Sequence, residues 1–358
     1  MKKRSVSILL IIFTLVSLLY LSPLVSAKIR RSYLQEFIFD NKISESEGFT
    51  NSIDEEIISY EATFYSLEIL DYYSLKNQAV DALELANTLR GELSSLLNNE
   101  EMTLSKMYFI LSSLEILGYE SNLEEELEFY LNQTEFLDGG FGAKNTSSSS
   151  NLISSYFAIN NYELIEKEMP NKTIHLNWIL NCGNSDGGFG GDPSIPSTVL
   201  NTYYAILSIG KLNESIGLPN EIKTLTYLGS FYSLSGGYLP DLNSNIPIIS
   251  QTYYAIKSIS LLNSTQYNDR SQTIDWILDQ QNLLDGGFSD PAGNIQKQSS
   301  SVSSSYFAFE TLLTLNAEVY LSQDIGIVQF NWIILLFILV GIAVAIGLGF
   351  FLWNKRKI

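Results

Sequence analysis

The sequence DGGFGG at residues 186–191, followed by NTYYAI at residues 201–206, is the clearest member of a series of similar stretches. Its glycine motif recurs as DGGFG at 138–142, SGGY at 235–238 and DGGFS at 285–289. The first glycines, at positions 139, 187, 236 and 286, lie 48, 49 and 50 residues apart. A fixed period of this length indicates a repeat architecture.

A second motif follows each glycine motif and carries paired aromatic residues. It reads SYFAI, TYYAI, TYYAI and SYFAF in the four units, and two degenerate copies precede them, TFYSL at 63–67 and MYFIL at 107–111. The first aromatic residues of these copies define six units: Phe64, Tyr108, Tyr156, Tyr203, Tyr253 and Tyr306.

Each unit predicts a pair of helices. In the fourth unit, residues 171–181 carry Ile174, Trp178 and Ile179 at helical spacing, which predicts a half-exposed helix. A Gly/Pro/Asp loop follows, and residues 197–212 are then apolar on nearly all sides, which is typical of a buried helix. Six such pairs that close on themselves form two concentric rings. The sequence therefore predicts an all-α fold, an α/α toroid with the buried helices inside.

These motifs resemble the prenyltransferase/squalene-cyclase repeat, which occurs in the β subunits of protein farnesyl- and geranylgeranyltransferases and in triterpene cyclases. The resemblance covers about residues 45–315 and implies an α/α toroid. We expect the glycines at positive φ in a tight turn, and the Asp side chains to accept hydrogen bonds from N–H groups of that turn. The resemblance concerns the fold, because these motifs are structural.

The chemistry of those families has no counterpart in the aligned positions. The resemblance to the β subunits implies zinc ligands Asp-x-Cys and a later His, but the matching residues are Gln251, Tyr253 and Ser304, or Asn201 and Tyr203 one unit earlier. The chain also lacks the Asp-x-Asp-Asp acid of the cyclases and the Gly-Cys-Gly-Glu-Gln of thioester domains. We therefore predict no metal site and no cofactor.

Both ends of the chain carry membrane signals. Residues 1–27 have a basic start, an apolar core and small residues up to Ala27, which predicts a cleaved signal peptide; an uncleaved signal anchor is the alternative. Residues 332–353 contain no charge, are long enough to span a bilayer, and precede the basic tail 354–358. These features predict a single-pass protein of the cell membrane, with a toroid ectodomain (28–316) and linker (317–331) outside and the tail in the cytoplasm.

Composition excludes several classes of partner and site. Six of the 21 basic residues lie in the acid-free ends 1–27 and 331–358, which leaves 15 basic against 39 acidic residues between them. Such an acidic surface repels phosphate backbones, so we predict no nucleic acid partner. The single His175 and Cys182 exclude a disulfide within the chain, and they lie too far apart along a helix for proton transfer.

Two further patterns are weaker. The pairs Asp186/Asp192 and Asp285/Asp290 offer too few oxygen ligands for calcium and favour turns. Five Asn-x-Ser/Thr sequons agree with export, although a chain rich in Asn and Ser contains some by chance; they lie at Asn132, Asn145, Asn171, Asn213 and Asn263.

The candidate site lies inside the predicted ring. We expect the six first aromatic residues to line a central ligand cavity, and the residues four positions later to share that face one turn deeper. These deeper residues are Glu68, Ser112, Asn160, Leu207, Lys257 and Glu310. In a closed ring Lys257, Glu310 and Glu68 stand on adjacent helices and form a candidate acid/base cluster. The alternative is a structural network in which they only neutralise one another.

Three functions fit this sequence. We favour a non-catalytic, membrane-anchored module that binds a lipid, a glycan or a protein partner, because a fold alone does not fix an activity. The alternative is an enzyme, either a prenyltransferase-like transferase or an acid/base lyase or hydrolase working in the cavity. Export argues against prenyl transfer, since diphosphate donors are cytosolic. A purely structural surface protein is the third reading.

Overall fold

The computed structural model describes residues 28–212, 218–263, 269–291 and 299–323. Residues 31–322 form one compact unit. The predicted signal peptide, the predicted membrane span 332–353 and the sequon residue Asn213 lie outside the described residues. Among the described helices, none combines the length and the apolar character needed to cross a membrane.

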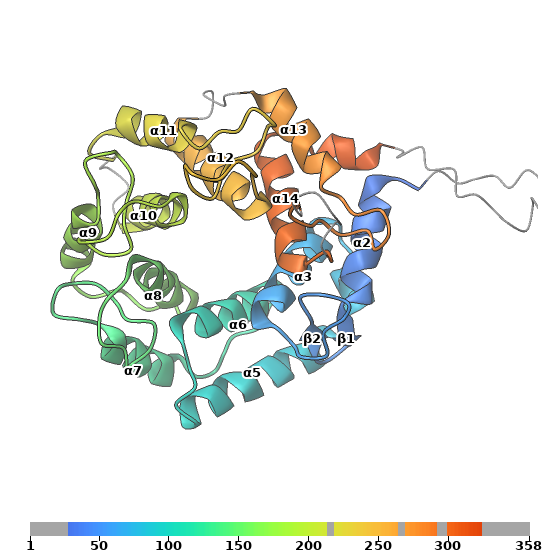
Figure 1. Cartoon of the computed structure of the whole chain (residues 1–358). Helices are drawn as coiled ribbons and strands as arrows, with labels where there is room; N and C mark the ends of the chain where they lie inside the picture. Colours follow the sequence, from blue (N-terminus) through green and yellow to red (C-terminus); the bar gives the residue numbers. More distant parts are fainter. Residues whose placement is uncertain (1–27, 213–217, 264–268, 292–298, 324–358) are drawn as a thin grey trace, which may run out of the picture. The chain divides into compact units, whose positions relative to one another are not determined.

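The larger unit is a double ring of helices, as Figure 1 shows. The inner helices are α3 (Tyr60–Tyr72), α6 (Leu104–Leu117), α8 (Leu152–Leu164), α10 (Val199–Leu212), α12 (Ile249–Asn263) and α14 (Val302–Thr314). Each inner helix packs on the next, and α14 packs on α3, which closes the ring. The α/α toroid predicted from the sequence is confirmed.

The outer ring contains the more exposed helices. They are α2 (Arg30–Asp40), α5 (Ala82–Asn98), α7 (Glu124–Thr134), α9 (Lys172–Asn181), α11 (Glu221–Gly229) and α13 (Arg270–Asp279). Shorter elements join them: α4 (Lys76–Ala79), the 3-10 helix η1 (Glu318–Ser322), and the antiparallel strands β1 (Lys42–Ser44) and β2 (Gly48–Phe49). The small residues Ala158, Ala205, Ala255 and Ala308 are fully buried on the inner helices, where they allow close packing.

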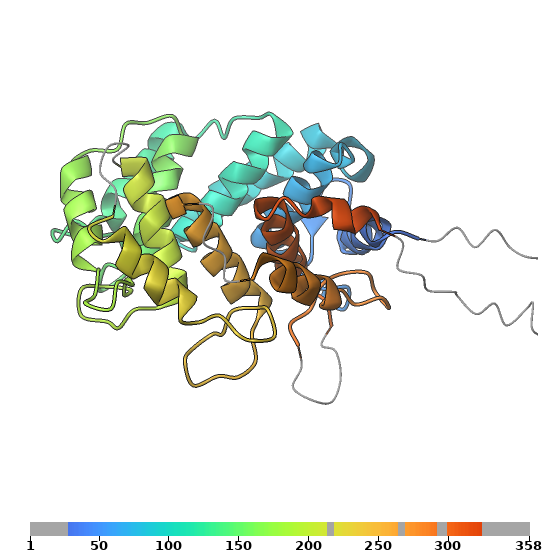
Figure 2. The same cartoon turned by 90° about the horizontal axis from the view of Figure 1, so that it is seen from above.

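The glycine motifs form one kind of turn at the start of the inner helices. Gly139, Gly187, Gly236 and Gly286 have φ between +92° and +113°, as expected. The Asp before the glycine pair accepts a hydrogen bond from the second glycine, at 2.9 Å in the case of Asp186 Oδ1 and Gly188 N. Figure 2 shows the loops before α10 and α12 on one side of the ring. We call the side with the inner helix N-termini the loop face, and the opposite side the C-terminal face.

A hydroxyl group ties each of these turns to its inner helix. In the fourth unit, Phe189 N–H donates to Thr202 Oγ1 at 3.0 Å, and Thr202 in turn donates to Thr198 O. The same bond from the loop aromatic residue recurs in four other units, with Thr63, Ser155, Thr252 and Ser305 as acceptors. The Ser or Thr before each aromatic pair is therefore a structural part of the repeat.

The next outer helix covers each glycine turn, and this arrangement closes the outer ring. A Cβ atom on Gly187 would lie 2.6 Å from Lys223 O in α11, and one on Gly286 would lie 2.3 Å from Tyr33 O in α2. The first helix of the chain thus covers the turn of the last unit. Contacts between the two ends of the sequence hold the toroid closed.

Two local predictions need correction. Ile174 is 49% exposed because it lies over the turn at Gly139 and not in the core. The expected linker from residue 317 does not start there, since Ala317 and Leu321 are fully buried in the toroid unit.

Candidate functional site

The centre of the ring is filled by aromatic side chains. Both residues of every aromatic pair face it, whereas the sequence analysis assigned only the first residue to the inside. We call this group the aromatic plug; it consists of Phe64, Tyr65, Tyr108, Phe109, Tyr156, Phe157, Tyr203, Tyr204, Tyr253, Tyr254, Tyr306 and Phe307. The free space among these side chains is about 50 Å³, which is room for one or two water molecules.

Ring-on-ring contacts run without a break around the plug. Tyr65 stacks on Tyr306 with centroids 4.1 Å apart, and Tyr253 stacks on Phe307 at 4.8 Å. The hydroxyls of Tyr203 and Tyr253 lie 3.0 Å apart, and burial raises the pKa of both phenols well above their usual range. The plug is therefore a neutral, tightly packed core. We predicted that the first aromatic residue of each pair binds a ligand, and this stays a prediction.

The plug separates two groups of acidic residues. On the side of the loop face, burial raises the pKa of Glu61, which is hydrogen-bonded to Tyr65. Burial chiefly raises the pKa of Tyr204 and Tyr254, and the charge of Glu61 adds to both shifts. On the other side, burial and then the charges of Glu310 and Glu68 raise the pKa of Tyr306.

On that second side Lys257 and Glu310 form an ion pair, and the charges of both act on the pKa of Glu68. Lys257 Nζ lies 2.6 Å from Glu310 Oε2, and both side chains are largely shielded from solvent. Burial and then the charge of Glu310 raise the pKa of Glu68 to about 6, and Lys257 opposes this shift. The three groups thus form one electrostatic cluster, whose role in catalysis or in stability stays a prediction.

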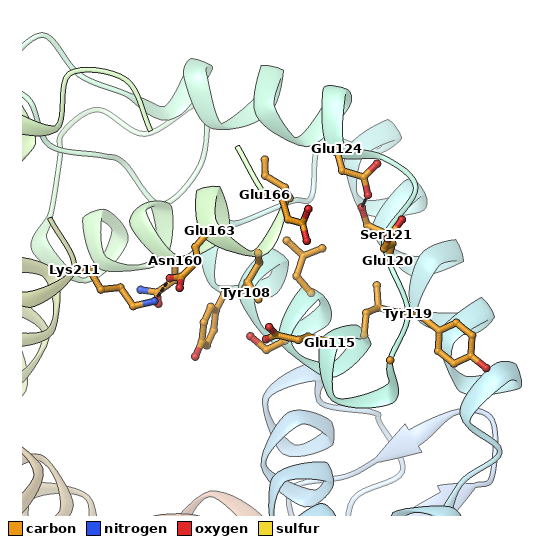
Figure 3. Close-up of a pocket in the computed structure, with 16 residues that line it drawn as sticks. Tyr108, Glu115, Tyr119, Glu120, Ser121, Glu124, Asn160, Glu163, Glu166 and Lys211 are labelled. Atoms are coloured by element: carbon orange, nitrogen blue, oxygen red, sulfur yellow. Dashed lines mark hydrogen bonds and ion pairs between the residues drawn. The ribbon is translucent and has the colours of Figure 1, made fainter. Parts of the chain in front are cut away.

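The residues one turn after the first aromatic residues form what we call the mouth layer: Glu68, Ser112, Asn160, Leu207, Lys257 and Glu310. Two of them, Ser112 and Asn160, line a cavity of about 490 Å³ between the C-terminal ends of α6 and α8 (Figure 3). We call it the mouth cavity. Its acidic residues are Glu115, Glu120, Glu124, Glu163 and Glu166, and its one basic residue is Lys211, which pairs with Glu163.

The sequence did not predict this cavity. Its acids lie on the last turns of α6 and α8, in the connections beyond them and at the first residue of α7, outside the repeated motifs. Glu166 reaches it from a left-handed backbone conformation with φ of 54°. One feature of the sequence could have indicated it: the mouth layer places polar and charged residues on inner helices that are otherwise apolar.

His175 and Cys182 are of the residue types best suited to bind soft metals, but both side chains are buried and lie against backbone carbonyl groups. Both ring nitrogens of the buried His175 face backbone carbonyls, Gly139 O at 2.7 Å and Pro170 O at 3.1 Å. Cys182 Sγ lies 3.4 Å from Trp178 O, and burial raises the pKa of its thiol to about 12. Within the described residues, no three His, Cys, Asp or Glu side chains gather closely enough to hold a metal ion.

The described sequons differ in exposure. Asn145 and Asn171 lie on exposed connections, and Asn171 has a left-handed φ of 50° before α9. Asn132 is also exposed, but it lies within α7 and its Oδ1 accepts a hydrogen bond from Tyr162. The backbone of Asn263 ends α12. Their glycosylation stays a prediction.

Comparison with known proteins identifies the family. A family model described as the prenyltransferase alpha-alpha toroid domain matches residues 1–150, 85–171, 145–247 and 244–333. These overlapping matches cover most of the chain and follow the repeat. The chain therefore belongs to the prenyltransferase α/α-toroid family.

Solved structures show the same fold at low identity. Protein geranylgeranyltransferase-I of Candida albicans, in complex with GGPP, is 18% identical with a TM-score of 0.55, over 75% of this chain and 86% of that chain. A type II terpene cyclase from Scytonema is 11% identical with a TM-score of 0.55, over 82% and 98%. A protein from Actinoplanes is 11% identical with a TM-score of 0.57, over 80% and 98%. These similarities establish the fold only.

Proposed function

We propose that this protein is a membrane-anchored, extracytoplasmic toroid that binds a partner at its C-terminal face and does not transfer prenyl groups. The observation that carries this proposal is the aromatic plug. Ligand pockets of typical size measure about 300–1,000 Å³, whereas the plug leaves about 50 Å³. A prenyl chain therefore does not fit at the ring centre without displacing several packed aromatic side chains.

The C-terminal face supports binding better than the ring centre does. Its mouth cavity of about 490 Å³ falls within the usual range of ligand sites. The anchored, external position rests on the sequence of residues 1–27 and 332–358, and the sequons agree with it.

Prenyl binding and transfer test the first part of the proposal. The full-length chain in detergent is mixed with radiolabelled geranylgeranyl diphosphate and a peptide that ends in a cysteine motif. We expect no saturable binding and no labelled peptide. Saturable binding below about 10 μM, the affinity range of specific ligands, or any enzyme-dependent transfer contradicts the proposal. A protein prenyltransferase in the same assay is the positive control.

Topology tests the second part. Protease added to intact cells is expected to release the toroid by cutting between residues 323 and 331, close to the predicted span. Release only after the cells are lysed contradicts the external location. A tag placed on the tail is the matched control, because the protease should cleave it only after the cells are lysed.

One observation favours a second function, acid/base catalysis by a lyase or hydrolase. Glu68 has a pKa of about 6, and the neighbouring Glu310 is paired with Lys257. Two carboxyl groups in different environments are the arrangement that general acid/base catalysis requires. Depolymerisation of a polysaccharide that is abolished by both Glu68→Gln and Glu310→Gln would establish it. Binding that both variants retain, without turnover, favours the non-catalytic module.

A further inference from the structure

We propose that the mouth cavity binds a basic segment of a partner protein, with a lysine or arginine side chain held by Asn160, Glu115 and Glu166. This inference rests on the proposed function, because it gives the chemical class of the partner that the C-terminal face binds. It follows from the cavity, from the hydrogen-bonding groups that line it and from the charge around it.

The acidic lining has few cationic neighbours left. The lysines at this end of the inner helices already form ion pairs: Lys76 with Asp71 at 2.8 Å, Lys211 with Glu163, Lys257 with Glu310 at 2.6 Å, and Lys167 with Glu125 and Glu128. Arg90 Nε donates to Glu120 O, the backbone oxygen of one lining residue. In the part of the chain that the structure describes, Glu115 and Glu166 form no ion pair. The cavity between them (Figure 3) therefore has an excess of negative charge.

Asn160 gives an independent indication of the ligand. Its side chain lines the cavity and is only 5% exposed. Its Nδ2 donates to Tyr156 O at 2.7 Å, but no donor among the described residues reaches its Oδ1. This oxygen is not one of the fully buried side-chain atoms that lack a partner, so it remains accessible from the cavity, and a ligand that carries N–H groups can donate to it.

The lining thus has acceptors in excess, with five glutamates against one lysine. The ammonium of lysine and the guanidinium of arginine carry only donors and match it. A volume of about 490 Å³ exceeds what one such side chain needs, so residues on either side of it also fit. The acid Glu68 lies close enough for its pKa to respond to Glu115, so the negative potential continues beyond the cavity. This potential favours a basic polypeptide segment over an isolated cation.

The experiment uses the full-length chain in detergent and a fluorescent peptide, Gly-Arg-Lys-Arg-Gly. We expect saturable binding that weakens several-fold between 50 and 200 mM salt, because charges dominate it. A Gly-Glu-Asp-Glu-Gly peptide is expected not to bind. Asn160→Leu, which removes the acceptor at similar size, should weaken binding about tenfold, the equivalent of one hydrogen bond to a charged group.

Two further variants separate this site from general electrostatic attraction. Asn160→Asp keeps the acceptor and adds a charge, so it should bind the basic peptide at least as tightly as the natural chain. Asp275→Asn removes one charge from an exposed position on α13, outside the cavity, and should change affinity less than twofold. Glu166→Gln, with the same charge change inside the cavity, should weaken binding about fivefold.

The outcomes distinguish this proposal from the one on which it rests. No binding of the basic peptide, equal loss with Asn160→Leu and Asp275→Asn, or tight binding of spermine with none of the peptide overturns the basic-segment site. None of these results would show prenyl transfer, so the non-catalytic function would stand. Melting curves of all variants exclude misfolding as the cause of a loss.

Discussion

The two ends of the inner helices differ in how strictly they repeat. At the loop face, four units carry the glycine pair and five carry the hydroxyl that binds the loop backbone. One turn beyond the first aromatic residues, the six units carry five different residue types: Glu68, Ser112, Asn160, Leu207, Lys257 and Glu310. At the loop face, the repeated side chains bind the backbone of their own loop in the same way from unit to unit. The side chains of the mouth layer face the ring opening and have no such common partner. The repeat builds the toroid, and departures from it build the site.

The largest expected effect is at the loop face. Gly187→Val and Gly286→Val each place a β-branched residue at a φ of +97° or +92° and its Cβ within 2.6 Å of backbone in the next outer helix. We expect each to lower the free energy of unfolding by about 3 kcal/mol or more. Urea unfolding followed by circular dichroism measures the loss.

A glycine without these constraints is the control for that experiment. Gly210 lies in α10, and a Cβ atom there would meet no atom within 4 Å. Gly210→Ala should therefore stabilise the protein by about 0.5–1 kcal/mol. Equal melting temperatures for Gly187→Val and Gly210→Ala would show that the turns are not built as described.

The second effect concerns the hydroxyl bond. Thr202 is fully buried and accepts from Phe189 N–H, so Thr202→Val leaves a buried donor without a partner. We expect a loss of about 1–3 kcal/mol in unfolding free energy. Thr202→Ser keeps the hydroxyl, as Ser155 and Ser305 do in other units, and should lose less than half as much. A Val variant as stable as the Ser variant contradicts this role.

The sequence could predict the loop face because its constraints are local. A glycine at positive φ, an Asp that accepts from the same turn and a fixed period all appear within a few dozen residues, and the structure confirms each of them. The closure by α2 could not be predicted, because Tyr33 and Gly286 are joined only by the geometry of the complete ring.

The candidate site was predictable only in part. Helical spacing placed Glu68, Lys257 and Glu310 at one level, and the structure brings them together. The spacing could not tell that the second aromatic residue of each pair also points inward and fills the ring. That outcome depends on the summed volume of twelve side chains in a narrow space. The mouth cavity was missed because all five of its acids lie outside the repeated motifs, two of them in connections between helices.

The third prediction concerns the mouth layer and depends on pH. Glu68 has a folded-state pKa of about 6 against an ordinary value of 4.5. Below pH 4.5 the carboxyl is protonated in both states; above pH 6 it is ionised in both, and the folded state then carries an unfavourable buried charge. Glu68→Gln should thus be as stable as the natural chain at pH 4 and more stable at pH 8. Discounted for partial exposure, the gain is about 1 kcal/mol.

Urea unfolding at pH 4, 6 and 8 measures this difference. Glu56→Gln, an exposed carboxyl in the loop before α3, is the control and should show no pH-dependent gain. If Glu68→Gln instead loses stability at pH 8, then the carboxylate contributes favourably through Lys257, and the cluster is a stabilising network.

The smallest effect tests a repeated feature of the loop face whose side chains are exposed to solvent. Leu137, Leu234 and Leu284 precede the Asp or Ser of three glycine motifs and are 108%, 92% and 98% exposed. The fourth unit has Ser185 at this position. Because no apolar area is buried there, Leu→Ser at all three positions should change the unfolding free energy by less than about 0.5 kcal/mol in total. A larger loss would mean that the leucines support the turns, and that every repeated residue of the loop face holds the ring. A negligible change would restrict the structural repeat to the glycines, the hydroxyls and the aromatic residues.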